Sequence, residues 1–212
     1  MRGVICIGGD GPGKGALRKI SEGTDLLVAA DSGLIAAEEA GLYPDWIIGD
    51  MDSLDDTLRL EKYPSDRVRR FPRDKDYTDT ELALALLREK GCDEIWISGG
   101  GGGRLDHLFA VRALFDREES PDRWFPGGAE IRCLKEGKLL DAVIKPGLVS
   151  VFPLGKGPWK AQSRGLKWPL DGLSWSPGSF GVSNIADTGS FEIRSILGRF
   201  LVFLPFSFGE DD

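Results

Sequence analysis

The chain has 212 residues, which allows one large domain or two small ones with an extensive core. Its formal net charge of −7 argues against a general nucleic-acid-binding or anionic-membrane surface. Three widely spaced cysteines give neither a disulfide framework nor zinc-ligand spacing, and no apolar run is long enough for a signal peptide or a bilayer span, so we expect a cytoplasmic protein.

The first predicted element is a buried strand over residues 4–7, followed by a glycine-rich stretch over 8–15. The glycine and lysine spacing resembles a P-loop. A P-loop, however, needs Ser or Thr directly after its lysine to hold Mg²⁺, and here Gly15 follows Lys14. We therefore expect a glycine-rich turn that lets a nucleotide approach the backbone.

A second buried strand is predicted over 26–30, and an Ala-rich helix over 32–40 follows it. Asp31 stands between the two elements, where it can serve as the helix N-cap. It also follows the carboxyl end of a strand, and ligands of open α/β sheets bind at that edge.

A third buried strand is predicted over 46–48, and two carboxylates, Asp50 and Asp52, follow it at the same edge. Like charges this close repel each other unless a cation lies between them, and Mg²⁺ prefers carboxylate oxygens. The alternative is a solvated turn in which one aspartate caps the next helix. That helix is predicted over 54–62, and a strand over 67–71 follows.

Three aspartates, Asp74, Asp76 and Asp79, precede a helix predicted over 82–87. Acidic residues stabilise the first turn of a helix, so part of this group is explained by capping. Three carboxylates exceed what a cap needs, which leaves a ligand-binding role open. Another strand is predicted over 94–98.

Five consecutive glycines over 99–103 and then Arg104 lead into a helix predicted over 108–114. A bare loop at a helix start presents N–H groups to an anion, and an arginine adds a planar donor suited to phosphate. The alternative is a flexible loop without a ligand. His107 is the only histidine, which excludes a metal site built on histidines.

Strand–helix alternation stops near residues 121–128. The rest of the chain has recurring glycines between short apolar runs, a pattern typical of a β-sandwich or barrel. We expect two domains, α/β over 1–134 and all-β over 135–212. The predicted strands of the second part are 131–134, 139–144, 149–154, 179–182, 191–196 and 200–205.

These motifs, in this order, resemble the thiamine pyrophosphokinase family over nearly the full chain. The matching pieces are ADSG (30–33), PDWIIGDMDS (44–53), DKDYTD (74–79), GRLDH (103–107), VSVFPL (149–154), GLKWPL (165–170) and VSN (182–184). The resemblance implies a Rossmann-like catalytic domain with a mostly parallel sheet, followed by a β-sandwich domain. It also implies diphosphate transfer from ATP to thiamine with release of AMP. The active site would lie between the two subunits of a homodimer.

The resemblance implies roles for individual residues. Asp50, Asp52 and Asp79 would hold Mg²⁺ directly or through water, with Asp31 close by, and either Asp31 or Asp79 would receive the hydroxyl proton. The nucleotide would be bound by Gly9, Asp10, Lys75, Asp76, Thr78, Gly102, Gly103, Arg104, Asp106 and His107. Thiamine would be bound by Trp168, Ser183 and Asn184.

Two of these implied roles have alternatives. The face of an indole suits a flat cationic thiazolium, but Trp168 could instead belong to the sandwich core. Lys75 stands where the family usually has Gln, so it would contact phosphate as a point charge or indicate another acceptor, such as a pterin alcohol. A nucleotide- or thiamine-binding sensor without turnover is the non-enzymatic alternative.

Overall fold

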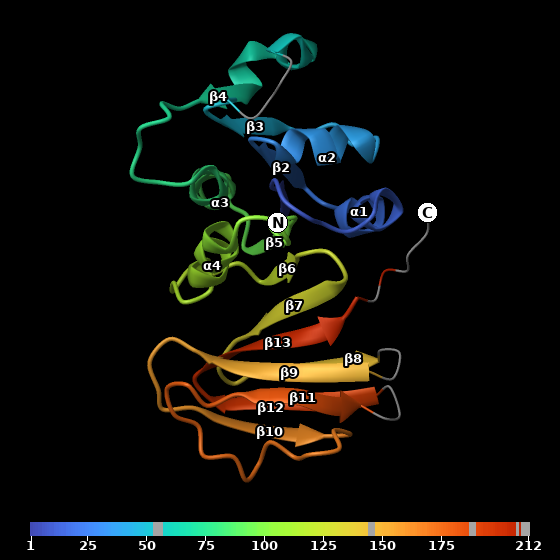
Figure 1. Cartoon of the computed structure of the whole chain (residues 1–212), viewed down its shortest axis with the longest axis vertical. Coiled ribbons are helices and arrows are strands. Elements are labelled where there is room, and N and C mark those ends of the chain that lie inside the picture. The colour runs from blue at the N-terminus through green and yellow to red at the C-terminus, as the bar shows by residue number, and fades with distance from the viewer. Residues whose placement is uncertain (53–56, 144–146, 187–189, 207, 209–212) are drawn as a thin grey trace. The chain divides into compact units, whose positions relative to one another are not determined.

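The computed structural model describes residues 1–52, 57–143, 147–186, 190–206 and 208 (Figure 1). These residues form two compact units. The first contains 1–111, 124–127 and 208, and the second contains 112–123 and the described residues of 128–206. The predicted limits of 1–134 and 135–212 remain a prediction about domains.

Five parallel strands form the centre of the first unit, in the order β5-β1-β2-β3-β4, with β6 next to β5. Their apolar residues are almost fully buried, as expected of parallel strands covered on both faces. The strands are β1 (Arg2–Cys6), β2 (Leu26–Ala30), β3 (Trp46–Gly49), β4 (Val68–Arg70), β5 (Glu94–Ser98) and β6 (Arg123–Phe125).

Helices flank these parallel strands. The helix α2 contacts β1 and β2, whereas α3 contacts β1, β2 and β3. Figure 1 shows α1 and α2 on one side of the strands and α3 on the other. The helices are α1 (Lys14–Ser21), α2 (Gly33–Glu39), α3 (Asp79–Glu89) and α4 (Leu105–Leu114), with 3₁₀ turns at Thr57–Lys62 and Ser65–Arg67.

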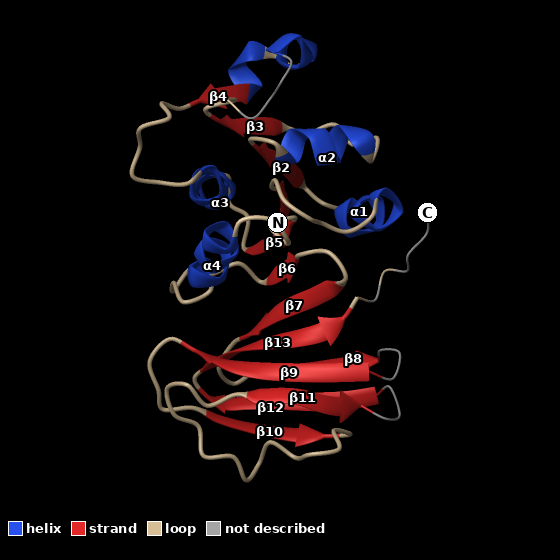
Figure 2. Cartoon of the chain, viewed as in Figure 1, coloured by secondary structure: helices blue, strands red, loops and turns tan. Residues whose placement is uncertain are grey.

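The described strands of the second unit pair antiparallel, in the order β11-β9-β13-β7 as part of a ten-stranded mixed sheet and in the order β10-β12-β8 as a separate three-stranded sheet (Figure 2). Both sheets contribute to one core, which includes Val151, Phe191 and Phe200. The strands are β7 (Ala129–Leu134), β8 (Leu139–Val143), β9 (Gly147–Leu154), β10 (Lys160–Arg164), β11 (Gly181–Ala186), β12 (Ser190–Leu197) and β13 (Arg199–Pro205).

The structure confirms a parallel α/β part followed by antiparallel strands, and it differs from the prediction in five elements. Helix α1 and strands β6 and β10 were not predicted. The expected strand over 179–182 is β11, which begins at Gly181. In the helix predicted over 54–62, residues 54–56 lie outside the described part and the rest is a 3₁₀ turn. No helix among the described residues combines the length and the apolar character that a membrane crossing requires.

Candidate active site

Three carboxylates meet at the carboxyl edge of the parallel strands. Asp31 follows β2, Asp50 follows β3, and Asp79 is the first residue of α3. One oxygen of each lies within 4.8 Å of the others, and all three residues are half-buried. We call Asp31, Asp50 and Asp79 the carboxylate cluster. Residues distant in sequence therefore converge where the strand order predicts a ligand.

The backbone around Asp31 brings two turns close together. Asp31 has φ of +49°, and its N–H donates to the Ile48 carbonyl at 2.8 Å. Gly49 has φ of +149°, and a Cβ there would lie 3.3 Å from that of Asp31. A side chain at residue 49 would thus be strained by its backbone conformation and crowded by Asp31. The position directly before Asp50 therefore favours glycine.

The ammonium of Lys75 lies among these carboxylates. Its Nζ is 3.2 Å from Asp79 Oδ1 and 3.9 Å from Asp50 Oδ2, and it donates a hydrogen bond to the Pro72 carbonyl at 3.1 Å. The Lys75 side chain is only 14% exposed. It is therefore a fixed local charge rather than a solvated surface lysine.

The pKa values of two cluster members shift in opposite directions. The backbone N–H of Asp52 donates to Asp50 at 3.0 Å and is the main reason why the pKa of Asp50 is lowered, with Lys75 adding to the effect. Burial raises the pKa of Asp79; Lys75 opposes this, while the Asp31 and Asp50 charges add to it. Asp79 is thus the more basic of the two carboxylates.

The cluster contains oxygen atoms without a hydrogen-bond donor. Asp31 Oδ1 is buried and accepts no hydrogen bond among the described residues, and Asp79 Oδ1 is buried with the Lys75 ammonium 3.2 Å away. Buried polar atoms normally have partners. Three carboxylates that share a single ammonium, one of them with an unsatisfied buried oxygen, fit a divalent cation such as Mg²⁺.

Asp52, expected as a metal ligand, is not a member of the cluster formed by the described residues. Its carboxylate pairs with Arg73 at 3.3 Å and is 45% exposed. Met51, between the two aspartates, has φ of +65°, which turns successive side chains away from one another. Asp52 contributes its backbone N–H to Asp50, a role that residue spacing alone does not reveal.

The two glycine-rich loops lie side by side, because β1 and β5 are neighbours. Asp10 and Gly101 exchange two backbone hydrogen bonds of 2.7 and 2.8 Å. The N–H groups of Gly99 and Gly100 also donate to backbone carbonyls, those of Phe125 and Gly8. Gly9 has φ of +88°, and a Cβ there would lie 2.9 Å from the Gly101 carbonyl oxygen.

Only the end of the five-glycine loop can therefore serve an anion. The N–H groups of Gly102 and Gly103 have no backbone partner among the described residues, whereas those of residues 99–101 are occupied. A Cβ at Gly102 would overlap the Asp10 carboxylate at 2.0 Å. The expected cradle is thus confined to two glycines at the start of α4.

The charged residues after this loop are exposed. The Arg104 guanidinium pairs with the Asp106 carboxylate, and this pairing lowers the pKa of Asp106. His107 is exposed in the first turn of α4. Reaching a phosphate would require Arg104 to exchange its partner Asp106, at little cost because exposed ion pairs are weak.

The remaining predicted nucleotide residues have unequal surroundings. Thr78 is the N-cap of α3: its Oγ1 accepts from the Glu81 N–H at 3.2 Å, and the Glu81 carboxylate accepts from the Thr78 N–H at 2.8 Å. Asp76 is exposed. Thr78 thus fixes the start of the helix that carries Asp79.

The predicted thiamine residues gather around one loop of the second unit. Asn184 is buried, and its amide accepts from the Trp168 N–H at 3.1 Å and donates to the Trp168 carbonyl at 2.6 Å. The Trp168 side chain is 53% exposed, so it is not a core residue. Asn184 therefore fixes the backbone that presents Trp168.

Two further contacts describe the surface around Trp168. The Lys167 ammonium lies 4.9 Å from the centroid of the Trp168 ring. The indole face thus already accepts a cation. Ser183 is exposed with φ of +60°, and its N–H donates to Ser150 Oγ at 3.1 Å. Strained backbone of this kind is common where ligands bind.

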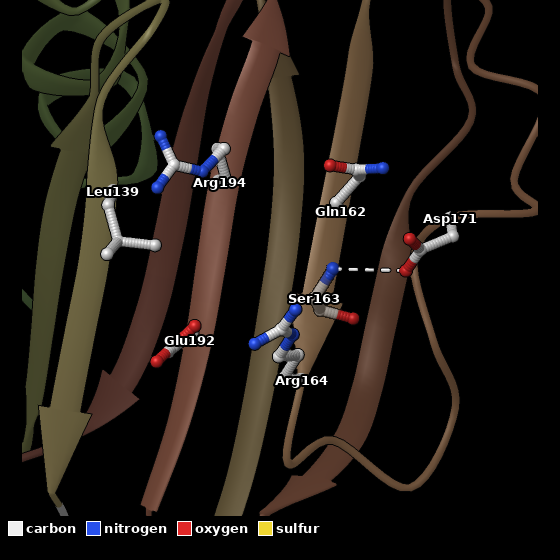
Figure 3. Close-up of a pocket in the computed structure, with 7 residues that line it drawn as sticks. All are labelled: Leu139, Gln162, Ser163, Arg164, Asp171, Glu192 and Arg194. Carbon is white, nitrogen blue, oxygen red and sulfur yellow. Dashed lines mark hydrogen bonds between the residues drawn. The ribbon is translucent and has the colours of Figure 1, made fainter.

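A separate depression of about 220 Å³ lies on the three-stranded sheet (Figure 3). Two of its lining residues are joined by a hydrogen bond of 3.1 Å, which the Ser163 N–H donates to the Asp171 carboxylate. Its lining residues are Leu139, Gln162, Ser163, Arg164, Asp171, Glu192 and Arg194. None of the predicted site residues is among them, so this depression is not the candidate active site.

Two family models match this chain, one in each part. The model described as "Thiamin pyrophosphokinase, catalytic domain" matches residues 17–120, and the model described as "Thiamin pyrophosphokinase, vitamin B1 binding domain" matches residues 140–196. The first contains the carboxylate cluster, and the second contains Trp168 and Asn184. The two matches together cover most of the chain.

Individual relatives bear similar names. A thiamine pyrophosphokinase of Bacillus subtilis (strain 168) is 37% identical over 85 residues, which span 39% of this chain and 39% of that protein. A solved thiamin pyrophosphokinase from Geobacillus thermodenitrificans has a TM-score of 0.74 at 25% identity, with 98% of each chain covered. A solved thiamine pyrophosphokinase from Bacillus subtilis has a TM-score of 0.80 at 23% identity, covering 98% of this chain and 100% of the other.

Proposed function

We propose that this chain, which belongs to the thiamin pyrophosphokinase family, transfers a diphosphate group from ATP to the thiamine hydroxyl with release of AMP. Its homologues indicate thiamine diphosphokinase activity. The observation that carries the proposal is the convergence of Asp31, Asp50 and Asp79 beside the two glycine-rich loops. Diphosphate transfer needs this combination, because a polyphosphate must be held and its growing charge neutralised.

The carboxylate cluster would hold Mg²⁺, with Asp52 supporting Asp50 through its backbone N–H or joining through water. When bound, the ion would neutralise charge on the polyphosphate oxygens. The buried Asp31 Oδ1, which accepts no hydrogen bond among the described residues, supports this assignment.

A carboxylate of the cluster would receive the proton of the thiamine hydroxyl as its oxygen attacks the β-phosphorus and the bond to the AMP oxygen breaks. Asp31 and Asp79 are the two candidates. Burial raises the pKa of Asp79 in the absence of an ion, which favours proton transfer to this carboxylate where it does not ligate Mg²⁺ directly.

The nucleotide would lie along the paired glycine-rich loops. The N–H groups of Gly102 and Gly103 would donate to phosphate oxygens at the start of α4. Arg104 and Lys75 would add positive charge to the same group. Gly9 and Asp10 would line the nucleotide, with Asp76, Thr78, Asp106 and His107 around its edge.

Thiamine would stack its thiazolium on the exposed face of Trp168, where the Lys167 ammonium now lies. Asn184 would keep this ring in place through the Trp168 backbone, and Ser183 would offer its hydroxyl to the pyrimidine. A cationic ring thus replaces a cationic side chain on the same aromatic surface.

At the molecular level we propose a cytoplasmic homodimer with a Rossmann-like catalytic domain. Its active site would combine the catalytic domain of one subunit with the sandwich of the other. The parallel strands that end in the cluster support the catalytic-domain assignment, and the shared site follows the arrangement that the family resemblance implies.

The test is a coupled assay of AMP release with ATP and Mg²⁺. Three reactions are compared: thiamine, a pterin alcohol, and no acceptor. We expect AMP with thiamine only. Asp50→Asn should lower kcat by about 10²-fold or more, since it removes an anionic ligand of the proposed Mg²⁺ that would neutralise the polyphosphate. The matched control is Asp66→Asn at an exposed residue outside the cluster, and it should keep the wild-type rate.

Each other result has a defined reading. AMP formed only with the pterin alcohol would replace thiamine as the acceptor. Tight thiamine binding without any AMP would make the protein a sensor rather than an enzyme. A fully active Asp50→Asn variant would contradict the proposal that the carboxylate cluster holds Mg²⁺.

A further inference from the structure

Lys75 occupies an unusual position for a lysine, between two carboxylates of the cluster. Its Nζ is 3.2 Å from Asp79 Oδ1 and 3.9 Å from Asp50 Oδ2. The hydrogen bond to the Pro72 carbonyl and the low exposure of 14% fix the ammonium there. The groups that would hold Mg²⁺ are thus already paired with a cation that belongs to the chain.

We propose that Lys75 is a resident counter-ion of the metal site. Its ammonium holds the carboxylate cluster together before a divalent ion binds, and it competes with that ion for Asp50 and Asp79. The inference rests on the proposed function, because it concerns the Mg²⁺ site assigned there. It makes Lys75 a positioning residue for the cluster and a determinant of metal affinity.

The charges explain why such a counter-ion is needed. Three ionised carboxylates within 4.8 Å repel one another, and the repulsion is greatest where water is partly excluded. One ammonium removes a third of this negative charge. The cluster can then persist in the folded protein without a metal ion, at the cost of a weaker hold on that ion.

The chemistry of lysine suits a counter-ion that must yield. An ammonium is a compact charge on a flexible four-carbon stem, whereas a guanidinium would hold a carboxylate in a rigid bidentate pair. A displaced Lys75 ammonium also stays close enough to meet the phosphates brought in by the substrate. The Lys75 ammonium can thereby neutralise the carboxylates before the metal ion binds and the substrate phosphates afterwards.

The experiment measures Mn²⁺ binding to the metal-free full-length protein by calorimetry and by electron paramagnetic resonance. Lys75→Met keeps the apolar stem but removes the charge. We expect it to bind Mn²⁺ about tenfold more tightly than wild type, a difference of about 1.4 kcal/mol. In EDTA the variant should have a lower Tm than wild type, and Mn²⁺ should raise its Tm by more.

Two further variants separate a counter-ion from a general charge effect. Arg73→Met removes one positive charge from the same loop, from the pair with Asp52. The charge of Arg73 acts on Asp50 less strongly than that of Lys75, so the gain in Mn²⁺ affinity should be clearly smaller than the gain from Lys75→Met. Lys75→Arg restores the charge and should return the affinity to within about threefold of wild type.

Several results would overturn the inference. Unchanged or weaker Mn²⁺ binding by Lys75→Met would do so, and so would an equal gain in affinity from Arg73→Met. If wild type binds Mn²⁺ and Lys75→Met does not alter that binding, only the counter-ion is wrong. A wild-type protein that binds no Mn²⁺ would remove the metal site itself and the counter-ion with it.

Discussion

Neighbouring carboxylates of one site can be tuned in opposite directions, as Asp50 and Asp79 show. Both lie near Lys75, yet the pKa of Asp50 is lowered and that of Asp79 is raised. The difference lies in their other surroundings: Asp50 accepts a backbone N–H from Asp52, whereas burial dominates at Asp79. A single site therefore contains one firmly ionised ligand and one more basic group.

The raised pKa of Asp79 predicts how stability depends on pH without metal. The folded state holds this proton more tightly than the unfolded state, so the contribution of Asp79 falls as pH rises from about 4 through its folded pKa. The lowered pKa of Asp50 has the opposite sign, and its stabilisation is lost as pH falls below about 4. In EDTA at pH 7, Asp79→Asn should raise Tm by about 2 °C.

Thermal unfolding in EDTA between pH 4 and pH 8 checks this prediction. Asp76→Asn, an exposed residue of the same loop, serves as the control and should follow the wild-type curve. If Asp79→Asn has a lower Tm than wild type at pH 7, the pairing with Lys75 outweighs the cost of burying Asp79.

The carboxylate cluster could be foreseen in part, since aspartates that follow adjacent parallel strands must share an edge. Asp31 and Asp50 were placed this way. The pairing of the Asp52 carboxylate with Arg73 could not be foreseen, because it depends on the left-handed conformation of Met51, a residue without a turn signal. The same holds for Asn184, where the sequence does not reveal that its amide is used by the Trp168 backbone.

At the scale of elements, the first residue of α2 packs closely against β1, and this contact positions Asp31. A Cβ on Gly33, the first residue of α2, would lie 2.0 Å from the Cys6 carbonyl oxygen of β1. That distance is far below any real contact, so a methyl group there must move the helix or the strand. Because Asp31 lies two residues before Gly33, next to the N-cap Ser32, its place in the cluster depends on this close packing.

Gly33→Ala is therefore expected to destabilise the protein by about 1–3 kcal/mol, the usual range for overpacking a core, and to weaken catalysis in the fraction that folds. Denaturant unfolding and the AMP assay measure the two effects. Gly172→Ala is the matched control, because a Cβ there meets nothing within 4 Å, and it should stay within about 0.5 kcal/mol of wild type. An equal loss in both variants would contradict the packing argument.

Strongly apolar elements were predicted well, and weakly apolar ones were not. The buried strands β1, β2, β3 and β5 are short runs that any periodicity analysis finds. The helix α1 has two glycines near its start, yet burial of Ala16, Leu17 and Ile20 stabilises it. In β10 the only fully buried residue is Ala161, so pairing with β12 defines the strand, and pairing is not visible in a local window.

At the scale of the whole molecule, the proposed chemistry is divided between two compact units. The carboxylate cluster and the glycine-rich loops belong to the first, and Trp168, Ser183 and Asn184 belong to the second. In the proposed homodimer, each active site draws these two sets from different subunits. Inactivation of one set should then be complemented by the other.

Subunit mixing tests this arrangement. Asp50→Asn and Trp168→Ala are expected to lower kcat/KM by about 10²-fold and about 10-fold, respectively. After joint refolding of equal amounts, half of the dimers should be mixed, and each of these has one intact site, giving about a quarter of the wild-type rate. If the mixture is no more active than its parts, both sets act within one subunit.

In the five-glycine loop, the first three residues are held by backbone hydrogen bonds and the last two are not. This difference affects which substitutions the loop can accept. Residues 99–101 donate hydrogen bonds to neighbouring backbone carbonyls, while the N–H groups of Gly102 and Gly103 have no backbone partner in the described part of the chain. Gly102 and Gly103 both have φ of +58°, so a residue with a side chain would be strained at either position. The loop would therefore offer phosphates its backbone rather than side chains, and a preference among nucleosides would have to come from other residues.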